Sequence, residues 1–342
     1  MKTQKLLFLS SLFILGCNQQ HQVAIQHLQA PSTALFQAVS MINENSIWVS
    51  GHQGSVIRSV DSGTTWDLYQ FVNDSLEFRD IHGINAEKAV VMSAGPGSSS
   101  RIYTFQTPGT WKENFIMPDS LGFLDCMDFW DARGIAYGDA IDKYPYILLT
   151  RDGGDSWYRA DTSNIPKAGI GEGGFAASGD CVTVQDGGKA WIATGAGGNA
   201  RFLVSEDYGS TWKSISSPMV KGEAAGHTAV VFEGQTGFAT GGDLMQADSY
   251  TDNCIFTENG GISWSLASKP NNTGAFYGAD IVKTGNKHFT FICGPAGVEY
   301  SDNFENNWRT LDTLNFWAVD FYNNVGFASG TNGKILRLEI QN

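Results

Sequence analysis

Three carboxylates are the residues of this chain whose types and spacing come nearest to catalytic chemistry. Asp139, Glu172 and Asp243 each stand in a Gly-rich segment that we predict to be a loop. Two carboxyl groups can cleave a glycosidic bond by acid and base catalysis when they lie about 5 to 10 Å apart. Because an Asp beside a Gly is usually a turn residue, glycoside hydrolysis stays a second hypothesis.

Other catalytic signatures are missing from the sequence. It contains no Gly-x-Ser-x-Gly elbow, no His-Glu-x-x-His and no phosphate-binding loop. The Gly-rich run at 195–200 has no predicted helix after it, so it is not a dinucleotide site. We expect no flavin, nicotinamide, haem or metal. The sequence therefore favours a binding protein over an enzyme.

A second set of polar and aromatic side chains is typical of a binding surface. A mixed polar and aromatic rim suits sugars, peptides or another protein. The candidate ligand-binding residues are Arg79, Asp142, Lys143, Tyr144, Arg201, His227, Tyr250, Tyr277 and Trp317. Near the starts of the innermost strands, around the mouth of a central channel, we expect Gln37, Arg79, His227, Tyr277 and Trp317.

A repeated hairpin predicts the elements that position these residues. Its clean copies read Ser/Thr-x-Asp/Asn-x-Gly-x-x-Trp, in which the Asp or Asn accepts turn N–H bonds, the Gly takes a positive φ and the Trp packs. The clean copies end at Trp66, Trp157, Trp212 and Trp264, and eroded copies end at Trp111 and Trp308. Spacings of 44 to 55 residues leave room for four short strands and predict propeller blades.

A second pattern predicts how many blades there are. An apolar run followed by a small-residue strand ending in Gly starts seven times, the last time over 316–330. Six hairpins then leave the last blade without its outermost strand, and residues 22–29 are expected to supply it because an open ring exposes strand edges. We predict an all-β, seven-bladed β-propeller in one domain over 22–342. The alternative treats residues 18–33 as a solvated tether.

The hairpins also predict which face of the ring carries the function. They all lie on one face, whereas the other face carries the second-to-third-strand loops and the crossings between blades. Segments 138–146 and 241–253 are expanded loops of this kind, and 161–178 is a long crossing. Loops mounted on rigid scaffolds commonly bind ligands, so we expect the site opposite the hairpins.

The N-terminus predicts export. Residues 1–16 combine Lys2 and Lys5 with an apolar stretch, as a signal peptide does. Cys17 ends a segment that resembles the bacterial lipoprotein processing box, and 17–21 would form a short tether. We therefore expect a lipoprotein of the periplasm or cell surface that contacts the membrane only through its lipid. Plain secretion with a free Cys17 is the alternative.

The net charge limits the class of partner, and the cysteine spacing limits the chemistry of the thiols. The formal charge of -13 makes nucleic acid an improbable partner, and we expect a monomer. The mature chain's cysteines, which show no Cys-x-x-Cys spacing, are Cys126, Cys181, Cys254 and Cys293. We interpret all four as buried small hydrophobic residues and predict no particular disulfide.

The hairpins resemble the Asp boxes of bacterial neuraminidase-repeat proteins. The sequence between them resembles the photosystem II assembly and stability factor family, chiefly over 123–139, 171–179 and 237–243. The resemblance implies a seven-bladed ring that serves as a binding or assembly platform for a protein or glycan. Because its bacterial branch is sometimes labelled oxidoreductase, that activity is a third hypothesis.

Overall fold

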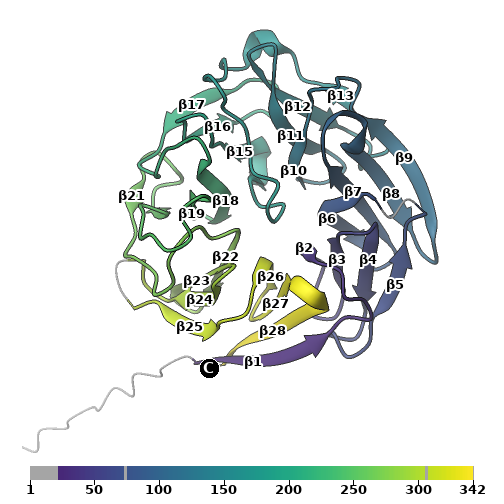
Figure 1. The fold of residues 1–342 in the computed structure, drawn as a ribbon, viewed down its shortest axis with the longest axis vertical. Helices are drawn as coiled ribbons and strands as arrows, with labels where there is room; N and C mark the ends of the chain where they lie inside the picture. The colour runs from purple at the N-terminus through teal and green to yellow at the C-terminus, as the bar shows by residue number, and fades with distance from the viewer. Residues whose placement is uncertain (1–21, 73–74, 305–306, 342) are drawn as a thin grey trace, which may run out of the picture.

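The chain forms a ring of seven antiparallel four-stranded sheets around a central axis (Figure 1). This computed structural model describes residues 22–72, 75–304 and 307–341, so the predicted signal peptide 1–16, Cys17 and the tether 17–21 lie outside the described residues. The prediction of an all-β, seven-bladed propeller is confirmed. Helix in the described part is limited to four short 3-10 turns, and none could span a membrane.

The strands follow one another outward from the axis within each blade. Blade 1 holds β2 (Phe36–Met41), β3 (Ile47–Gly51), β4 (Ser55–Ser59) and β5 (Asp67–Gln70). Blade 2 holds β6 (Glu77–Asn85), β7 (Lys88–Ala94), β8 (Arg101–Gln106) and β9 (Thr110–Ile116), with η1 at Gly97–Ser99. Blade 3 holds β10 (Leu124–Phe129), β11 (Gly134–Ile141), β12 (Tyr144–Thr150) and β13 (Tyr158–Arg159), followed by η2 at Thr162–Asn164.

The remaining blades repeat this order. Blade 4 holds β14 (Val182–Gln185), β15 (Lys189–Ala193), β16 (Arg201–Ser205) and β17 (Lys213–Ser216), with η3 at Asp186–Gly188. Blade 5 holds β18 (Ala225–Glu233), β19 (Thr236–Asp243), β20 (Cys254–Thr257) and β21 (Ser265–Leu266). Blade 6 holds β22 (Gly278–Thr284), β23 (Lys287–Gly294), β24 (Gly297–Ser301) and β25 (Arg309–Asp312). Blade 7 holds β26 (Phe316–Tyr322), β27 (Val325–Gly330), β28 (Lys334–Gln341) and β1 (Gln22–Gln29), with η4 at Thr331–Gly333.

The N-terminal strand closes the ring. β1 pairs antiparallel with β28 over eight residues, from Gln22 opposite Gln341 to Gln29 opposite Lys334. In Figure 1 the purple β1 runs along the outside of the yellow β28. The closure predicted from the missing seventh hairpin is therefore confirmed, and residues 22–29 are part of the fold and not a tether.

The hairpin turns are held by their own side chains. The Ser59 hydroxyl accepts the Gly63 N–H at 2.9 Å, and Asp61 Oδ1 accepts the Thr65 N–H at 2.8 Å. Gly63 adopts a φ of 81°, and a Cβ there would lie 2.8 Å from the Phe327 ring of the preceding blade. This turn therefore needs its Gly both for backbone conformation and for close packing against the neighbouring blade.

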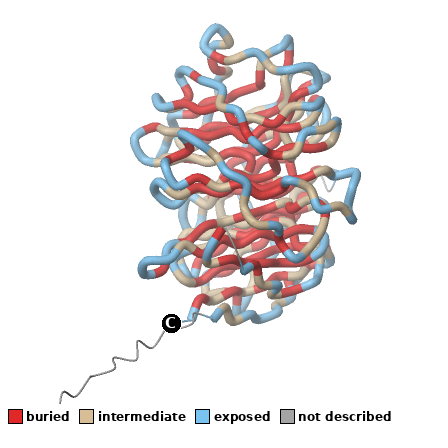
Figure 2. Tube along the Cα trace, turned by 90° about the vertical axis from the view of Figure 1, so that its left-hand side faces the viewer, coloured by how far each residue is buried: buried red, intermediate tan, exposed pale blue. Residues whose placement is uncertain are grey.

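The hydrophobic core is divided among the interfaces between blades. Seven clusters of buried side chains each join two neighbouring blades, including the pair formed by blades 7 and 1. Figure 2 shows the buried strands in red inside a surface of exposed turns. Burial of apolar surface between sheets therefore fixes the ring as one rigid scaffold.

One pair of cysteines links two blades. Cys126 in β10 and Cys181, directly before β14, form a disulfide with a Cα–Cα distance of 5.8 Å. Cys254 and Cys293 are buried and free. Our interpretation of all four as buried hydrophobic residues is thus wrong for the pair. The two residues do stand on different blades, but innermost strands of neighbouring blades meet near the axis, where a disulfide can form.

Candidate functional site

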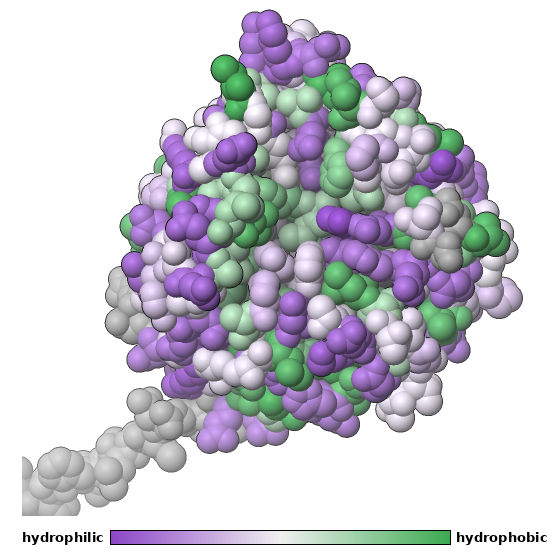
Figure 3. Space-filling view, in the orientation of Figure 1, coloured by the Kyte–Doolittle hydropathy of each residue, from purple (hydrophilic) through white to green (hydrophobic). Residues whose placement is uncertain are grey.

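The face opposite the hairpin turns, called the loop face, carries large exposed apolar side chains. Leu121 is 85% exposed, Ile170 96% and Met245 81%, and each lies in a blade crossing or a second-to-third-strand loop. Figure 3 shows apolar patches in green among hydrophilic side chains around the ring. Isolated exposed apolar residues are common, but three of them in the loops and crossings of one face indicate a contact surface.

The three predicted expansions on this face are present. The connection from β19 to β20 runs over 244–253, and the crossing from β13 to β14 runs over 160–181. The third, 138–146, is longer than its counterpart at 51–55, but it is an extended hairpin and not a loop, because β11 continues to Ile141 and β12 starts at Tyr144. Asp142 and Lys143 form its two-residue turn, with φ values of 52° and 73°. They are exposed, whereas Tyr144 packs against the core between blades 3 and 4.

Glu172 and Arg201 form a buried ion pair. The Glu172 side chain is 2% exposed, and its Oε1 and Oε2 accept from Arg201 Nε and Nη2 at 2.6 and 2.9 Å. Thr194 Oγ1 and the Gly169 N–H also donate to this carboxylate. The pair anchors the 160–181 crossing to β16. Both residues therefore have structural positions, in place of the catalytic and ligand-binding roles that we predicted.

Asp139 and Asp243 make local backbone contacts. Asp139 Oδ1 accepts the Gly174 N–H at 3.1 Å, and burial raises the pKa of this carboxyl. Asp243 Oδ1 accepts the Met245 N–H at 2.9 Å and its Oδ2 accepts from Gln246 Nε2 at 2.8 Å. The first aspartate thus fixes the crossing, and the second orders the start of the 244–253 loop.

The two aspartates belong to different blades, Asp139 to β11 of blade 3 and Asp243 to β19 of blade 5. Asp139 contacts the 160–181 crossing, whereas Asp243 contacts the start of its own loop. Glycosidic cleavage by two carboxyl groups needs about 5 to 10 Å between them, and glycoside hydrolysis by this pair stays a prediction.

His227 is also structural. It is fully buried, with Nδ1 2.8 Å from the Thr194 carbonyl oxygen and Nε2 2.8 Å from the Ser217 hydroxyl. A carbonyl only accepts, so Nδ1 carries the hydrogen and Nε2 accepts from Ser217. Burial lowers the pKa of His227 to about 4. The predicted ligand contact is therefore wrong, because the imidazole is enclosed and both nitrogens are occupied.

A ring of β-bulges marks the loop-face ends of the innermost strands. Bulges re-aim single side chains, and here each bulge residue directly follows a buried residue near the start of its strand. The residues in the bulges are Gln37, Arg79, Asp125, Thr228 and Trp317. Buried polar atoms of three of them have no hydrogen-bond partner in the described residues, namely both amide atoms of Gln37, Asp125 Oδ2 and Trp317 Nε1.

Sequence reasoning missed Asp125 in this ring. A repeated pair could have found it, since an apolar residue precedes each mouth residue in Phe36-Gln37, Phe78-Arg79, Leu124-Asp125, Phe276-Tyr277 and Phe316-Trp317. The predicted members Tyr277 and Trp317 pack together, with their ring centroids 4.5 Å apart and their ring planes tilted by 53°. Tyr250 lies farther out, where its hydroxyl donates to the Asn271 carbonyl.

Residues 173–180, called the channel segment, lie across the central channel. Arg79 Nη1 of blade 2 donates to the Ala176 carbonyl at 3.2 Å, and the Ser178 hydroxyl donates to the Tyr277 carbonyl of blade 6 at 2.8 Å. Figure 1 shows a loop from the teal part of the chain entering the ring centre. The predicted mouth residue Arg79 is thus bound to this segment and to Glu77.

Below the channel segment, five aspartates line a cavity of about 190 Å³. The carboxylate girdle consists of Asp80, Asp128, Asp180, Asp280 and Asp320. Each accepts a backbone N–H from another blade: Met127 donates to Asp80, Val184 to Asp128, Ala279 to Asp180, Phe321 to Asp280 and Met41 to Asp320. The girdle therefore ties blades together. No group of three or more His, Cys, Asp or Glu in the described residues could hold a metal ion.

The girdle predicts that stability falls at alkaline pH. Burial raises the pKa of Asp128 to about 7 and of Asp180 to about 8, and raises those of Asp80, Asp280 and Asp320. An aspartate in the unfolded chain titrates near 3.9, so between that pH and the raised pKa values the folded state binds more protons than the unfolded state. The stability that this proton binding gives is lost as pH rises through the raised pKa values. We expect calorimetry to show a Tm lower by roughly 2–4 °C at pH 9 than at pH 7.

Between pH 7 and pH 9 the effect of the girdle on stability can be measured apart from that of the buried histidines. His82 and His227 have pKa values of about 4, so their opposite effect on stability is complete near pH 7. Asp180→Asn should flatten the dependence, and Asp186→Asn, an exposed change on the hairpin face, should leave it intact. A Tm that rises between pH 7 and pH 9 would contradict the prediction.

Comparison with known proteins gives the fold and no more. Neither a protein-family model nor a curated protein sequence matches this chain. A solved structure described as YCF48 bound to D1 peptide is similar, with a TM-score of 0.62 and 15% identity over 93% of this chain and 97% of that one. A structure described as YCF48 from Cyanidioschyzon merolae has a TM-score of 0.64 and 14% identity, over 92% of this chain and 99% of that one.

A structure described as an ancestral GH74 enzyme gives a TM-score of 0.63 and 13% identity over 90% of this chain and 45% of that one. The likeness is one of fold. At these identities neither binding nor catalysis transfers to this chain, since unrelated functions share the propeller architecture.

Proposed function

We propose that this protein is an exported, lipid-anchored propeller whose loop face binds another protein and serves as an assembly or interaction platform. The observation that carries the proposal is the set of exposed apolar side chains in the loops and crossings of this face, Leu121, Ile170 and Met245. The similar fold of YCF48, which has been solved bound to D1 peptide, supports a peptide or protein ligand over a glycan.

Export is supported by the leader-like sequence at 1–16 and by the disulfide. Disulfides persist mainly in oxidising compartments outside the cytosol, and Cys126–Cys181 fits such a location. Lipidation at Cys17 would hold the ring at a membrane through the lipid alone. Mass spectrometry of the membrane fraction should detect diacylated Cys17, and Cys17→Ser should release the protein. An unmodified, membrane-free wild-type protein would remove the anchor from the proposal.

The binding role is tested by a surface variant. Leu121→Ser, Ile170→Ser and Met245→Ser change exposed side chains, so the Tm should stay within about 2 °C while apolar contact area with a partner is lost. Pull-down from native membranes should recover partners with wild type and lose them with the triple variant. Ile262→Ser is the matched control, because Ile262 is 82% exposed on the hairpin face. Equal recovery by the triple variant would reject the loop face as the binding surface.

A further inference from the structure

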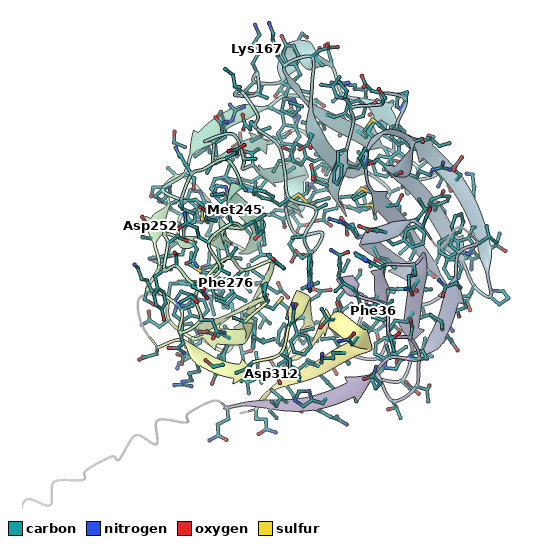
Figure 4. The ribbon with its side chains drawn as sticks, in the orientation of Figure 1. Phe36, Lys167, Met245, Asp252, Phe276 and Asp312 are labelled. Carbon is teal, nitrogen blue, oxygen red and sulfur yellow. A yellow bond between two sulfur atoms is a disulfide. The ribbon has the colours of Figure 1, made fainter. Side chains whose placement is uncertain are left out.

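A small cleft opens on the loop face between blades 5 and 6. Its volume is about 220 Å³, and it lies between the 244–253 loop, the crossing that follows β21, and the turn between β23 and β24. Apolar walls come from Ala247, Ala275, Tyr277 and Pro295, and two carboxylates, Asp243 and Asp248, also line it. In Figure 4, Met245 lies on the inner side of this loop and Asp252 on its outer side.

Backbone hydrogen bonds hold the cleft walls in place. The Gly274 N–H donates to the Ser249 carbonyl at 3.0 Å, and the Phe276 N–H donates to the Gly241 carbonyl at 2.9 Å. Gly274 adopts a φ of 84°, and a Cβ there would lie 2.5 Å from the Ala247 carbonyl oxygen. The loop and the crossing are thus pressed together, and a ligand would meet a cleft that already has its shape.

The carboxylates of the cleft are available to a cation. Asp243 is oriented by donors from Met245 and Gln246, which are neutral, and Asp248 is exposed. Neither carboxylate forms an ion pair within the described part of the chain. With a net charge of -13, the protein attracts positive groups to such a site.

The size of the cleft indicates what enters it. Sites for whole small molecules usually measure about 300–1,000 Å³, so a volume of about 220 Å³ suits one side chain better. Lysine and arginine combine an apolar stem with a charged head, which matches alanine and proline walls beside carboxylates. We propose that this cleft takes a lysine or arginine side chain of the partner protein as an anchor. The proposal rests on the proposed function, since it names the partner's contact residue.

Peptides that differ at one position test the anchor. Fluorescence anisotropy is measured with labelled heptapeptides Gly-Ser-Leu-X-Leu-Ser-Gly, where X is lysine, arginine, norleucine or glutamate. We expect the lysine and arginine peptides to bind at least about fivefold more tightly than the norleucine peptide, which has the stem without the charge. The preference should shrink as salt is raised from about 50 to 500 mM, because the pair is partly exposed.

Two variants assign the preference to the cleft. The double variant Asp243→Asn with Asp248→Asn should abolish the preference for the lysine and arginine peptides. The amide oxygen introduced by Asp243→Asn can still accept the Met245 N–H. The control variant Asp186→Asn, on the hairpin face, should keep the preference. Equal affinity of the lysine, norleucine and glutamate peptides, or no binding of any up to about 1 mM, would overturn the proposal. If the double variant still recovers partners from membranes and the Leu121, Ile170 and Met245 variant does not, the anchor fails and the proposed function stands. If both variants recover them, both fail.

Discussion

Deletion of residues 22–29 is expected to open the ring and lower the Tm by roughly 10 °C or more. The deletion removes all eight pairs between β1 and β28, and with them Val23 and Leu28, which pack against the cores on either side of blade 7. It also leaves β28 as a long exposed edge, which promotes association with other chains. Calorimetry and size-exclusion chromatography of the purified protein measure both effects.

A matched control distinguishes the pairing of β1 with β28 from the identity of its exposed side chains. Ile25→Ser changes an exposed side chain of β1 and should leave the ring closed. A synthetic peptide with the sequence of residues 22–29 should restore part of the lost Tm by occupying the edge of β28. A deletion variant that stays monomeric and has the same Tm as the wild type would show that closure of the ring at blade 7 does not depend on β1.

Glu172→Gln is expected to destabilise the fold by about 3 kcal/mol, because it leaves the Arg201 guanidinium without its charge partner in a largely buried place. Denaturant unfolding followed by tryptophan fluorescence gives the free energy of unfolding directly. The free energy of unfolding should fall less in the double variant Glu172→Leu with Arg201→Leu than in Glu172→Gln, because the double variant removes both charges from the interior.

An exposed ion pair provides the control for this effect. Arg101 Nη1 lies 2.7 Å from Glu113 Oε2, nearly the same distance, but both side chains reach solvent. Glu113→Gln should therefore cost less than about 1 kcal/mol. Equal losses at the two sites would mean that burial of Glu172 does not govern its contribution.

The sequence predicted the features that short-range chemistry encodes. The Trp66 hairpin and its copies carry their turn-forming Ser, Asp and Gly within eight residues, so the blades could be counted from spacing alone. The assignment of residues 22–29 to the last blade followed from that count and the need to cover an edge. Cys254 and Cys293 were likewise predicted as buried because no partner motif accompanies them.

Features that depend on contacts between blades could not be predicted. The Cys126–Cys181 disulfide, the Glu172–Arg201 pair and the enclosure of His227 each join residues 10 to 55 positions apart, through packing that no local pattern encodes. Segment 138–146 was predicted as a loop and is a hairpin, because strand ends depend on cross-strand pairing, which carries β11 to Ile141 and starts β12 at Tyr144. The channel segment was predicted only as a long crossing.

The direction of β1 has a consequence for how the protein would stand on a membrane. Gln22 pairs with Gln341 at the hairpin face and Gln29 pairs with Lys334 at the loop face, so the chain enters the ring from the hairpin side. Gln22 lies only five positions after Cys17 in the sequence, a reach of about 18 Å at full extension. In a lipid-anchored protein the hairpin turns would therefore face the bilayer, and the loop face would point away from it toward approaching proteins.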